Sequence, residues 1–307
     1  GRWSFDIHLV INLPTGVDIK NLINDLREIS WKASEILLSY SQILKDPYSK
    51  SNIIQNDNIN DPVTLADLNV NNLIIKKIQE KYGSTNWQIL SEENVKLAPN
   101  KLITNSDWLW VLDPLDGTKD FIQGTSNYAM HLALNYKQKP CIGIVLIPEK
   151  HELWISDGEK VWCEKRDGSK FRPNLPKNKN LEDMILVTSK NHKNDTLMKL
   201  IANIKFKDVK NMGSIGCKFA SILRGESDIY ISLSLPGKSS PKDWDFAAPE
   251  AILKMCGGAV TDLYNNELIY GKTNFEQGGV IIASNNKNIH KRHCNKIREI
   301  IRKFEIF

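Results

Sequence analysis

The sequence contains no CxxC pair, and its five cysteines, an odd number, are scattered along 307 residues. A disulfide framework is therefore not expected, and reduced thiols in a cytoplasmic-type compartment fit the pattern better. None of the cysteines starts a Cys-x5-Arg loop, which excludes the phosphatases that use a cysteine nucleophile. A Gly-x-x-x-x-Gly-Lys-[Ser/Thr] loop is also lacking, so the P-loop class of nucleotide-binding site is not expected.

Apolar runs of membrane-spanning length are lacking as well. The short apolar patch at residues 9–13 does not have the length or flanks of a secretory signal, so we expect a cytoplasmic protein with no membrane partner. The net charge of +5 is compatible with an anionic small-molecule substrate but too weak to indicate nucleic-acid binding. Whether the chain is a monomer or a homodimer stays open.

What the sequence does contain is an ordinary globular composition, with 41% apolar residues, and enough length for one large domain or two lobes. Apolar residues spaced by three and four predict helices at residues 18–44 and 64–82. Between them, an asparagine-rich stretch at 45–60 is typical of a loop. Closely spaced apolar segments then predict an antiparallel meander, with strands at 108–112, 128–136, 141–147, 152–156 and 160–164.

A segment rich in proline, lysine and asparagine, residues 166–180, indicates a boundary between two lobes. After it, the predicted elements alternate: strand 185–188, helices 196–203 and 215–223, strand 229–233, helix 244–256, strand 280–283 and helix 288–304. We therefore predict an α/β protein with an α+β lobe at residues 1–175 and an α/β lobe at residues 176–307.

The stretch Asp113-Pro114-Leu115-Asp116-Gly117-Thr118 places two acids three residues apart at the end of an apolar run. Proline and glycine force a bend, so that both carboxylates and the Leu115 carbonyl can point at one spot. Oxygen ligands of this kind suit Mg²⁺. A plain surface turn is the competing interpretation, because Asp, Pro and Gly are all turn formers.

Three more acids lie beside apolar sequence at predicted element ends. Glu92 follows an apolar pair, and a solvated charge at a strand end is the simple alternative for it. Asp67 lies three residues after Thr64, nearly the spacing of a capping box, so it can equally be a helix cap. Asp245 opens a helix, where an acid also complements the helix dipole. Taken together, these acids indicate one site built from several element ends.

In order along the chain, the segments PVTLAD, LSEEN, WVLDPLDGT and WDFAAPEAILKMCGG resemble the inositol monophosphatase superfamily of Mg²⁺-dependent, lithium-sensitive phosphatases. The resemblance covers about residues 18–286 and implies a layered α/β/α/β/α sandwich. Within the superfamily, DGTKDF is most similar to the 3'(2'),5'-bisphosphate nucleotidases. The stretches Thr188–His192 and Gly213–Phe219 also resemble nucleotidase segments, the second with one residue more before its lysine.

The resemblance implies a role for each matching residue. The metal ligands would be Glu92, Asp113, the Leu115 carbonyl, Asp116 and Asp245. Asp67 and Thr118 would orient and deprotonate the attacking water. Contacts to the phosphorylated substrate would come from Gly117, Thr118, His192, Ser214, Lys218 and Arg224. For Lys218 and Arg224, an ordinary solvated surface charge is the alternative, and the role of residues 233–242, which look longer than in simple family members, stays open.

The expected function is thus a Mg²⁺-dependent phosphomonoesterase, with adenosine 3',5'-bisphosphate as the first substrate to consider. An inositol or other sugar-phosphate phosphatase is the alternative, and a non-catalytic phosphometabolite-binding protein is a more remote one. By their types alone His290, His293 and Cys294 suggest a zinc site, but lysines and arginines surround them. We expect that stretch to be a solvated basic face of a terminal helix.

Overall fold

The computed structural model describes residues 13–48, 61–98, 106–191 and 193–307. The elements of the first part of the chain are α2 (Ile19–Lys45), α4 (Pro62–Tyr82), β1 (Gln88–Ser91), α5 (Glu92–Leu97), β2 (Trp108–Asp116), α6 (Thr118–Gln123), β3 (Ala129–Tyr136), β4 (Lys139–Ile147), β5 (Glu152–Ser156), β6 (Val161–Lys165) and β7 (Lys170–Phe171). The elements of the second part are β8 (Ile185–Ser189), α7 (Asp195–Ile204), β9 (Asp208–Met212), α8 (Ile215–Leu223), β10 (Ile229–Ser234), α9 (Asp243–Met255), β11 (Ala259–Asp262), β12 (Gly279–Ser284) and α10 (His290–Lys303).

The first sheet has seven strands in sequence order, β1 to β7. Strands β2 to β6 form the predicted antiparallel meander. The short strand β7, inside the segment predicted as the lobe boundary, extends it, and β1 adds to it in parallel with β2. The second sheet has five strands in the order β11-β12-β10-β8-β9. The two sheets are separated along the chain near the predicted boundary, between Phe171 and Ile185.

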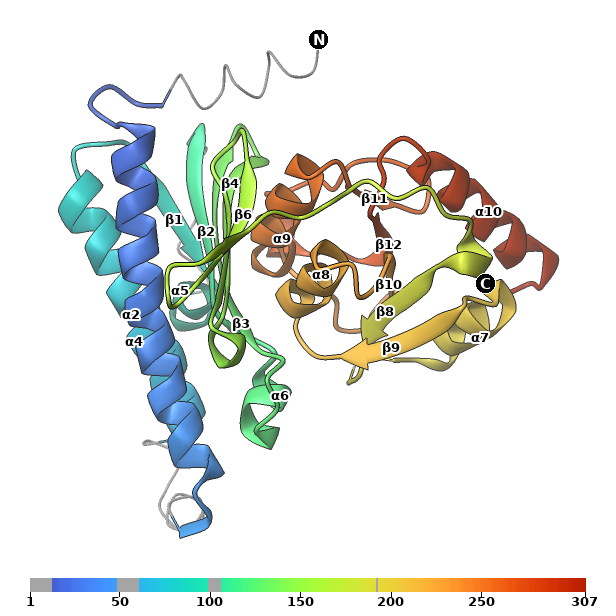
Figure 1. Cartoon of the computed structure of the whole chain (residues 1–307), viewed down its shortest axis with the longest axis horizontal. Coiled ribbons are helices and arrows are strands. Elements are labelled where there is room, and N and C mark those ends of the chain that lie inside the picture. Colours follow the sequence, from blue (N-terminus) through green and yellow to red (C-terminus); the bar gives the residue numbers. More distant parts are fainter. Residues whose placement is uncertain (1–12, 49–60, 99–105, 192) are drawn as a thin grey trace.

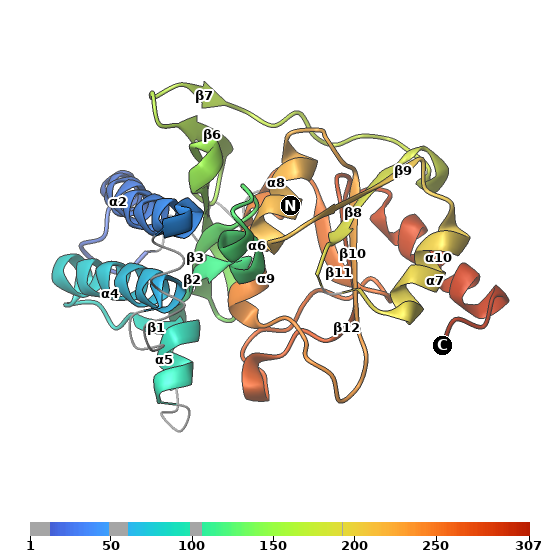
Figure 2. The same cartoon turned by 90° about the horizontal axis from the view of Figure 1, so that it is seen from below.

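The elements stack in five layers, which Figures 1 and 2 show from two sides. Helices α2 and α4 cover the outer face of the first sheet, α8 and α9 lie between the sheets, and α7 and α10 cover the second sheet. The α/β/α/β/α arrangement implied by the resemblance is therefore confirmed. No helix in the described ranges is both long and apolar enough to cross a membrane.

Strand β2 shows why its residues form a central strand. Its side chains alternate between two buried clusters, Trp110 and Leu112 facing α2 and α4, and Leu109 and Val111 facing α8 and α9. A strand with both faces covered is apolar on both faces, which explains the continuous apolar run. The strand continues to Asp116, four residues beyond the predicted end, and so carries the two acids itself.

Two predictions about helices are wrong in detail. Helix α4 begins at Pro62, and its N-cap is Asp61, whose Oδ1 accepts the backbone N–H of Val63 at 3.1 Å. Asp67 is therefore not a cap. On α10, His290, His293 and Cys294 are buried rather than solvated, because they lie on the face that packs toward the second sheet. The expected loop at 45–60 falls mostly outside the described residues.

Candidate active site

The turn after β2 is shaped by local backbone geometry. The pairing of β2 with β3 shifts register between Asp113 and Asp116, and Asp113 Oδ1 accepts the backbone N–H of Leu115 at 3.2 Å. Gly117 follows with φ of +86°, a conformation that side chains other than glycine's disfavour. A Cβ there would lie 2.7 Å from the Asn127 carbonyl oxygen. The glycine thus lets the strand pass directly into α6.

The predicted metal ligands converge on one cavity of about 720 Å³. Glu92 is the first residue of α5, directly after β1, and the parallel pairing of β1 with β2 brings it to the same sheet edge as Asp113. Asp245 arrives from the other side, in the first turn of α9. The cavity is lined by all five predicted ligands: Glu92, Asp113, Leu115, Asp116 and Asp245.

The acids of this cavity repel one another. Burial, followed by the charges of Glu92, Asp116 and Asp245, raises the pKa of Asp113 well above its usual range. Burial and the charge of Asp116 likewise raise the pKa of Asp245 to about 8. Carboxylates that are buried away from water and repel one another in this way can all be ionised only if a cation balances their charge. The donor set, carboxylates with a backbone carbonyl beside them, fits a hard divalent metal such as Mg²⁺.

His131 is a site residue that the sequence reasoning missed. It lies on β3, fully buried, with Nε2 3.5 Å from Asp116 Oδ2 and Nδ1 3.2 Å from the Trp244 carbonyl oxygen. Asp113, Asp116 and His131 each offer a ligand atom, and these atoms lie within 4.8 Å of one another. Within the described ranges they form the one such group of acids, histidines and cysteines, so His290, His293 and Cys294 do not form a zinc site there.

Asp67 lies beside this cavity rather than on its wall. Its side chain is buried, and among the described residues Oδ1 has no hydrogen-bond partner. Burial, followed by the charges of Glu93 and Glu92, raises the pKa of Asp67 to about 8. Thr118 lines the cavity as the first residue of α6, but no hydrogen bond joins its side chain to Asp67 in the described ranges. Both residues of the predicted pair thus lie near Glu92, Asp67 beside the cavity and Thr118 on its wall.

The second sheet and its helices supply the opposite wall. Ser214 caps α8, accepting the backbone N–H of Cys217 at 3.2 Å, and Ile215 donates its backbone N–H to Asp116 Oδ2 at 2.7 Å. Lys218 is 3% exposed, which removes the surface-charge alternative for this residue. Its Nζ donates to the Met212 carbonyl at 3.3 Å and lies 5.8 Å from the centre of the Tyr230 ring. Ser214 and Lys218 both line the cavity.

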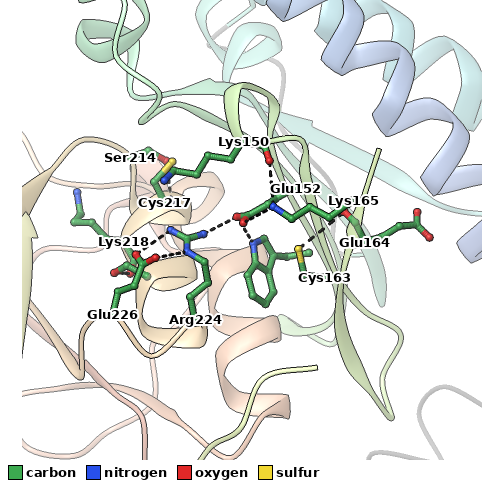
Figure 3. Close-up of polar contacts among 12 residues, drawn as sticks. Lys150, Glu152, Cys163, Glu164, Lys165, Ser214, Cys217, Lys218, Arg224 and Glu226 are labelled. Carbon is green, nitrogen blue, oxygen red and sulfur yellow. Dashed lines mark hydrogen bonds and ion pairs between the residues drawn. The ribbon is translucent and has the colours of Figure 1, made fainter. Parts of the chain in front are cut away.

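Arg224 does not join this wall, and its assignment as a substrate contact is corrected. Figure 3 shows its guanidinium turned toward Glu152 and Glu226, and its Nη1 lies 2.5 Å from Glu152 Oε1. The arginine thus connects the end of α8 to β5 of the first sheet. His192 lies outside the described residues, so the structure places nothing of it.

Several further residues on the cavity wall had not been identified from the sequence. Asp120 and Asn191 face each other across the lobes, with Asn191 Nδ2 3.3 Å from Asp120 Oδ2. Residues 235–241, the connection between β10 and α9, contribute Leu235, Lys238, Ser239, Ser240 and Pro241. The long stretch at 233–242 therefore forms part of the cavity wall.

Comparison with known proteins identifies the family to which the chain belongs. The sequence profile of the inositol monophosphatase family matches residues 18–302. The chain belongs to the inositol monophosphatase family. It is accordingly a metal-dependent phosphatase, and its five-layer fold is the fold of that family.

Individual relatives in the family carry different names. The chain is 31% identical over 211 residues to 3'(2'),5'-bisphosphate nucleotidase CysQ of Buchnera aphidicola, covering 69% of this chain and 75% of the relative. It is 28% identical over 250 residues to Nus factor SuhB of Escherichia coli K12, covering 78% of this chain and 84% of the relative. The solved structure of an inositol monophosphatase from Zymomonas mobilis superposes with a TM-score of 0.71 at 20% identity, covering 92% and 99% of the two chains.

Proposed function

We propose that this protein is a Mg²⁺-dependent 3'(2'),5'-bisphosphate nucleotidase that converts adenosine 3',5'-bisphosphate and water to AMP and inorganic phosphate. The observation that carries the proposal is the pairing of two opposite walls in one cavity. One wall holds the acid cluster of Glu92, Asp113, Asp116 and Asp245, and the other holds the buried ammonium of Lys218. A monophosphate needs only the first wall, whereas a bisphosphate uses both.

Each residue has a task in this proposal. Glu92, Asp113, Asp116, Asp245 and the Leu115 carbonyl would hold the metal. Bound Mg²⁺ supplies positive charge to the phosphate oxygens and acidifies water. The backbone N–H groups of Gly117 and Thr118 orient the scissile phosphate, since the first residues of a helix have no intrahelical partner for their N–H groups. Thr118 and Asp67 orient the attacking water and take its proton.

The attack breaks the bond between phosphorus and the 3'-oxygen of the ribose, and that oxygen leaves with a proton from solvent. Lys218 holds the 5'-phosphate through a charge-assisted hydrogen bond, the strong class of such contacts. Because Lys218 is buried, water screens this contact less than it would at the surface.

The test is a substrate panel on the wild-type protein and on Lys218→Met, which removes the ammonium and keeps the chain length. Released phosphate is measured with Mg²⁺ for adenosine 3',5'-bisphosphate, 2'-AMP and inositol 1-phosphate. We expect the wild type to prefer the bisphosphate. In Lys218→Met the KM for the bisphosphate should rise about tenfold or more, because this is the effect expected from losing one hydrogen bond to a charged group. Turnover of the monophosphates should change little.

The matched control is Lys199→Met, an exposed lysine on α7, which should leave all three substrates unaffected. Equal damage to every substrate in a folded Lys218→Met protein would remove the second-phosphate role. A wild-type preference for inositol 1-phosphate would favour the inositol-phosphatase alternative instead.

We also propose that Li⁺ inhibits the enzyme. Li⁺ is close to Mg²⁺ in size but has half its charge, so at a metal position it would occupy the ligands without supplying the same chemistry. Phosphate release should fall with LiCl and not with NaCl at equal ionic strength. Equal effects of the two salts would instead indicate screening.

A further inference from the structure

Lys96 places a cation against the acids of the proposed metal site. It lies on α5, four residues after Glu92 and three after Glu93, so all three side chains share one face of the helix. Its Nζ lies 3.1 Å from Glu92 Oε1 and 3.3 Å from Glu93 Oε1. The spacing along one helical turn places the ammonium beside Glu92 in the metal-free chain.

The ammonium reaches Glu92 from the solvent side. The Lys96 side chain is 59% exposed, whereas the side chains of Glu92 and Glu93 are 24% and 9% exposed. Glu92 also lines the cavity and contributes to the raised pKa of the buried Asp113, whereas Lys96 is not a wall residue. The Glu92 carboxylate therefore lies between a tethered ammonium on one side and the acid cluster on the other.

We propose that Lys96 is a tethered counter-cation that competes with the metal for Glu92 and thereby sets the Mg²⁺ concentration at which the site fills. The inference rests on the proposed function, since it takes Glu92 as a metal ligand. Without metal, the ammonium offsets part of the repulsion among Glu92, Glu93 and the buried acids. When a metal binds, the exposed lysine loses this partner and turns into solvent.

This competition predicts the direction in which the melting temperature and the Mg²⁺ affinity change, and both can be measured without an activity assay. Removing the ammonium leaves the metal-free acids less compensated, so the metal-free protein should melt at a lower temperature. It also removes a competitor, so Mg²⁺ should bind more tightly. The gain is limited to about fivefold, because an ion pair with one exposed partner contributes little. The increase in melting temperature at saturating Mg²⁺ should accordingly be larger.

The experiment uses the full chain with Lys96→Met, Lys96→Arg and the control Lys77→Met. Lys77 pairs with Glu80 three residues away on α4, at 3.6 Å. This is a comparable lysine–glutamate pair within one helix, and it involves none of the proposed metal ligands. Mg²⁺ affinity is measured by isothermal titration calorimetry, and melting temperatures are recorded with and without Mg²⁺. We expect tighter binding and a lower metal-free melting temperature in Lys96→Met alone. Lys96→Arg, which keeps the charge, and Lys77→Met should resemble the wild type.

A Mg²⁺ affinity of Lys96→Met within about twofold of the wild type would overturn the inference and leave the proposed metal site standing. Equal changes in Lys96→Met and Lys96→Arg would overturn it too, because the effect would then not depend on charge. Absence of Mg²⁺ binding in the wild type would contradict the proposed function itself, and this inference with it.

Discussion

Asp116 illustrates how one residue can belong to two parts of the site. Its Oδ2 accepts the backbone N–H of Ile215 at 2.7 Å and lies 3.5 Å from His131 Nε2. The carboxylate thereby joins the end of β2 to the start of α8 and, in the proposed function, binds a metal as well. Position and charge make separate contributions, and a substitution can separate them.

Asp116→Asn keeps the size of the side chain and an oxygen that can accept the Ile215 N–H, but removes the charge. We expect phosphatase activity at saturating Mg²⁺ to fall by about 10²-fold or more, because the substitution removes one charged ligand of the proposed metal site. The metal-free protein should melt no lower than the wild type, because repulsion with Asp113 and Asp245 is reduced.

Asp157→Asn is a suitable comparison, because its carboxylate also accepts backbone N–H bonds, from Glu159 and Lys160, but in a turn. It should keep its activity. Near-normal turnover of Asp116→Asn would contradict the assignment of Asp116.

Asp67 gives a prediction with a defined pH dependence. Burial raises its pKa to about 8, so the folded protein holds a proton that the unfolded chain releases near pH 4. Between these values, the unfolded state binds fewer protons, and the cost to the metal-free fold grows as pH rises from about 4 to 8. Asp67→Asn removes that cost. The variant should be more stable than the wild type at pH 8, on the order of 1 kcal/mol or more, and the gain should shrink toward pH 4.

Chemical denaturation of metal-free protein at several pH values measures this gain, and phosphate release measures activity. We expect activity to fall by about 10²-fold, in the range of general acid–base effects. Full activity in the variant would remove Asp67 from the mechanism. Lower stability at pH 8 would contradict the role of burial.

At the scale of elements, α10 has its predicted bounds to within two residues, but the surroundings of its histidines were predicted wrongly. Its lysines and arginines suggested a solvated helix, yet His290 is 1% exposed. His290 Nε2 lies 2.7 Å from Thr261 Oγ1, and Nδ1 lies 2.6 Å from Ser284 Oγ. These partners are on β11 and β12, so the imidazole joins the helix to the second sheet. Both contacts are available to a neutral imidazole.

This geometry predicts acid sensitivity. Burial, followed by the charge of His293, lowers the pKa of His290 to about 4, whereas an unfolded histidine titrates near 6.5. As pH falls from about 6.5 to 4, the unfolded state binds more protons, so the free energy of unfolding decreases. In His290→Gln that loss should be smaller by about 1–2 kcal/mol between pH 7 and pH 4.5.

Urea denaturation at these pH values measures the difference. His151→Gln, at an exposed histidine after β4, should keep the acid loss of the wild type. An unchanged loss in His290→Gln would show that the imidazole is not the group responsible.

The sequence predicted the long and periodic elements well, because their signal spans many residues. Helix α2 and strands β3 to β6 were found within a few residues of their observed ends. Short elements were missed for physical reasons. Strand β9 has the sequence DVKNM and lies at a sheet edge with no fully buried residue, so it lacks apolar alternation. Strand β1 has four residues and gains its stability from pairing with β2.

The acid cluster was predictable because its residues follow apolar segments at element ends. The opposite wall was harder, since a match in sequence does not give the direction of a side chain. Lys218 and Arg224 are six residues apart, which on a helix is about 120° away from the same face. One enters the cavity and the other pairs with Glu152. His131 gave only a weak signal, a single polar residue on a strand face shared with Ala129 and Ala133.

At the scale of the whole molecule, the central buried cluster joins the two sheets. It includes Val111 and Val145 of the first sheet, Phe219 of α8, Phe246 of α9 and Ile281 of the second sheet. Helix α9 packs closely enough on β4 that a Cβ at Gly143 would lie 2.9 Å from both the Ala248 oxygen and Ala251 Cβ. This close contact fixes the helix that carries Asp245.

Gly143→Ala should therefore reduce phosphatase activity, although Gly143 does not line the cavity. The added methyl has to displace α9, and we expect a loss of about 1–3 kcal/mol of stability, as in overpacked cores. The Mg²⁺ concentration for half-maximal activity should rise with it. Gly278→Ala, whose Cβ would have its nearest neighbour at 3.8 Å, is the control. Loss of stability with unchanged Mg²⁺ dependence would show that α9 does not transmit the change to Asp245.

The segment between β7 and β8 resembles a linker between independent units, but the shared central cluster gives it a different meaning. A chain cut there would leave Glu92, Asp113 and Asp116 on one fragment and Lys218 and Asp245 on the other. Each fragment would also expose the apolar face that normally contacts its counterpart. Neither piece would hydrolyse substrate by itself, and activity would return only on reassembly, so the protein could be engineered as a two-part complementation reporter of proximity between fused proteins.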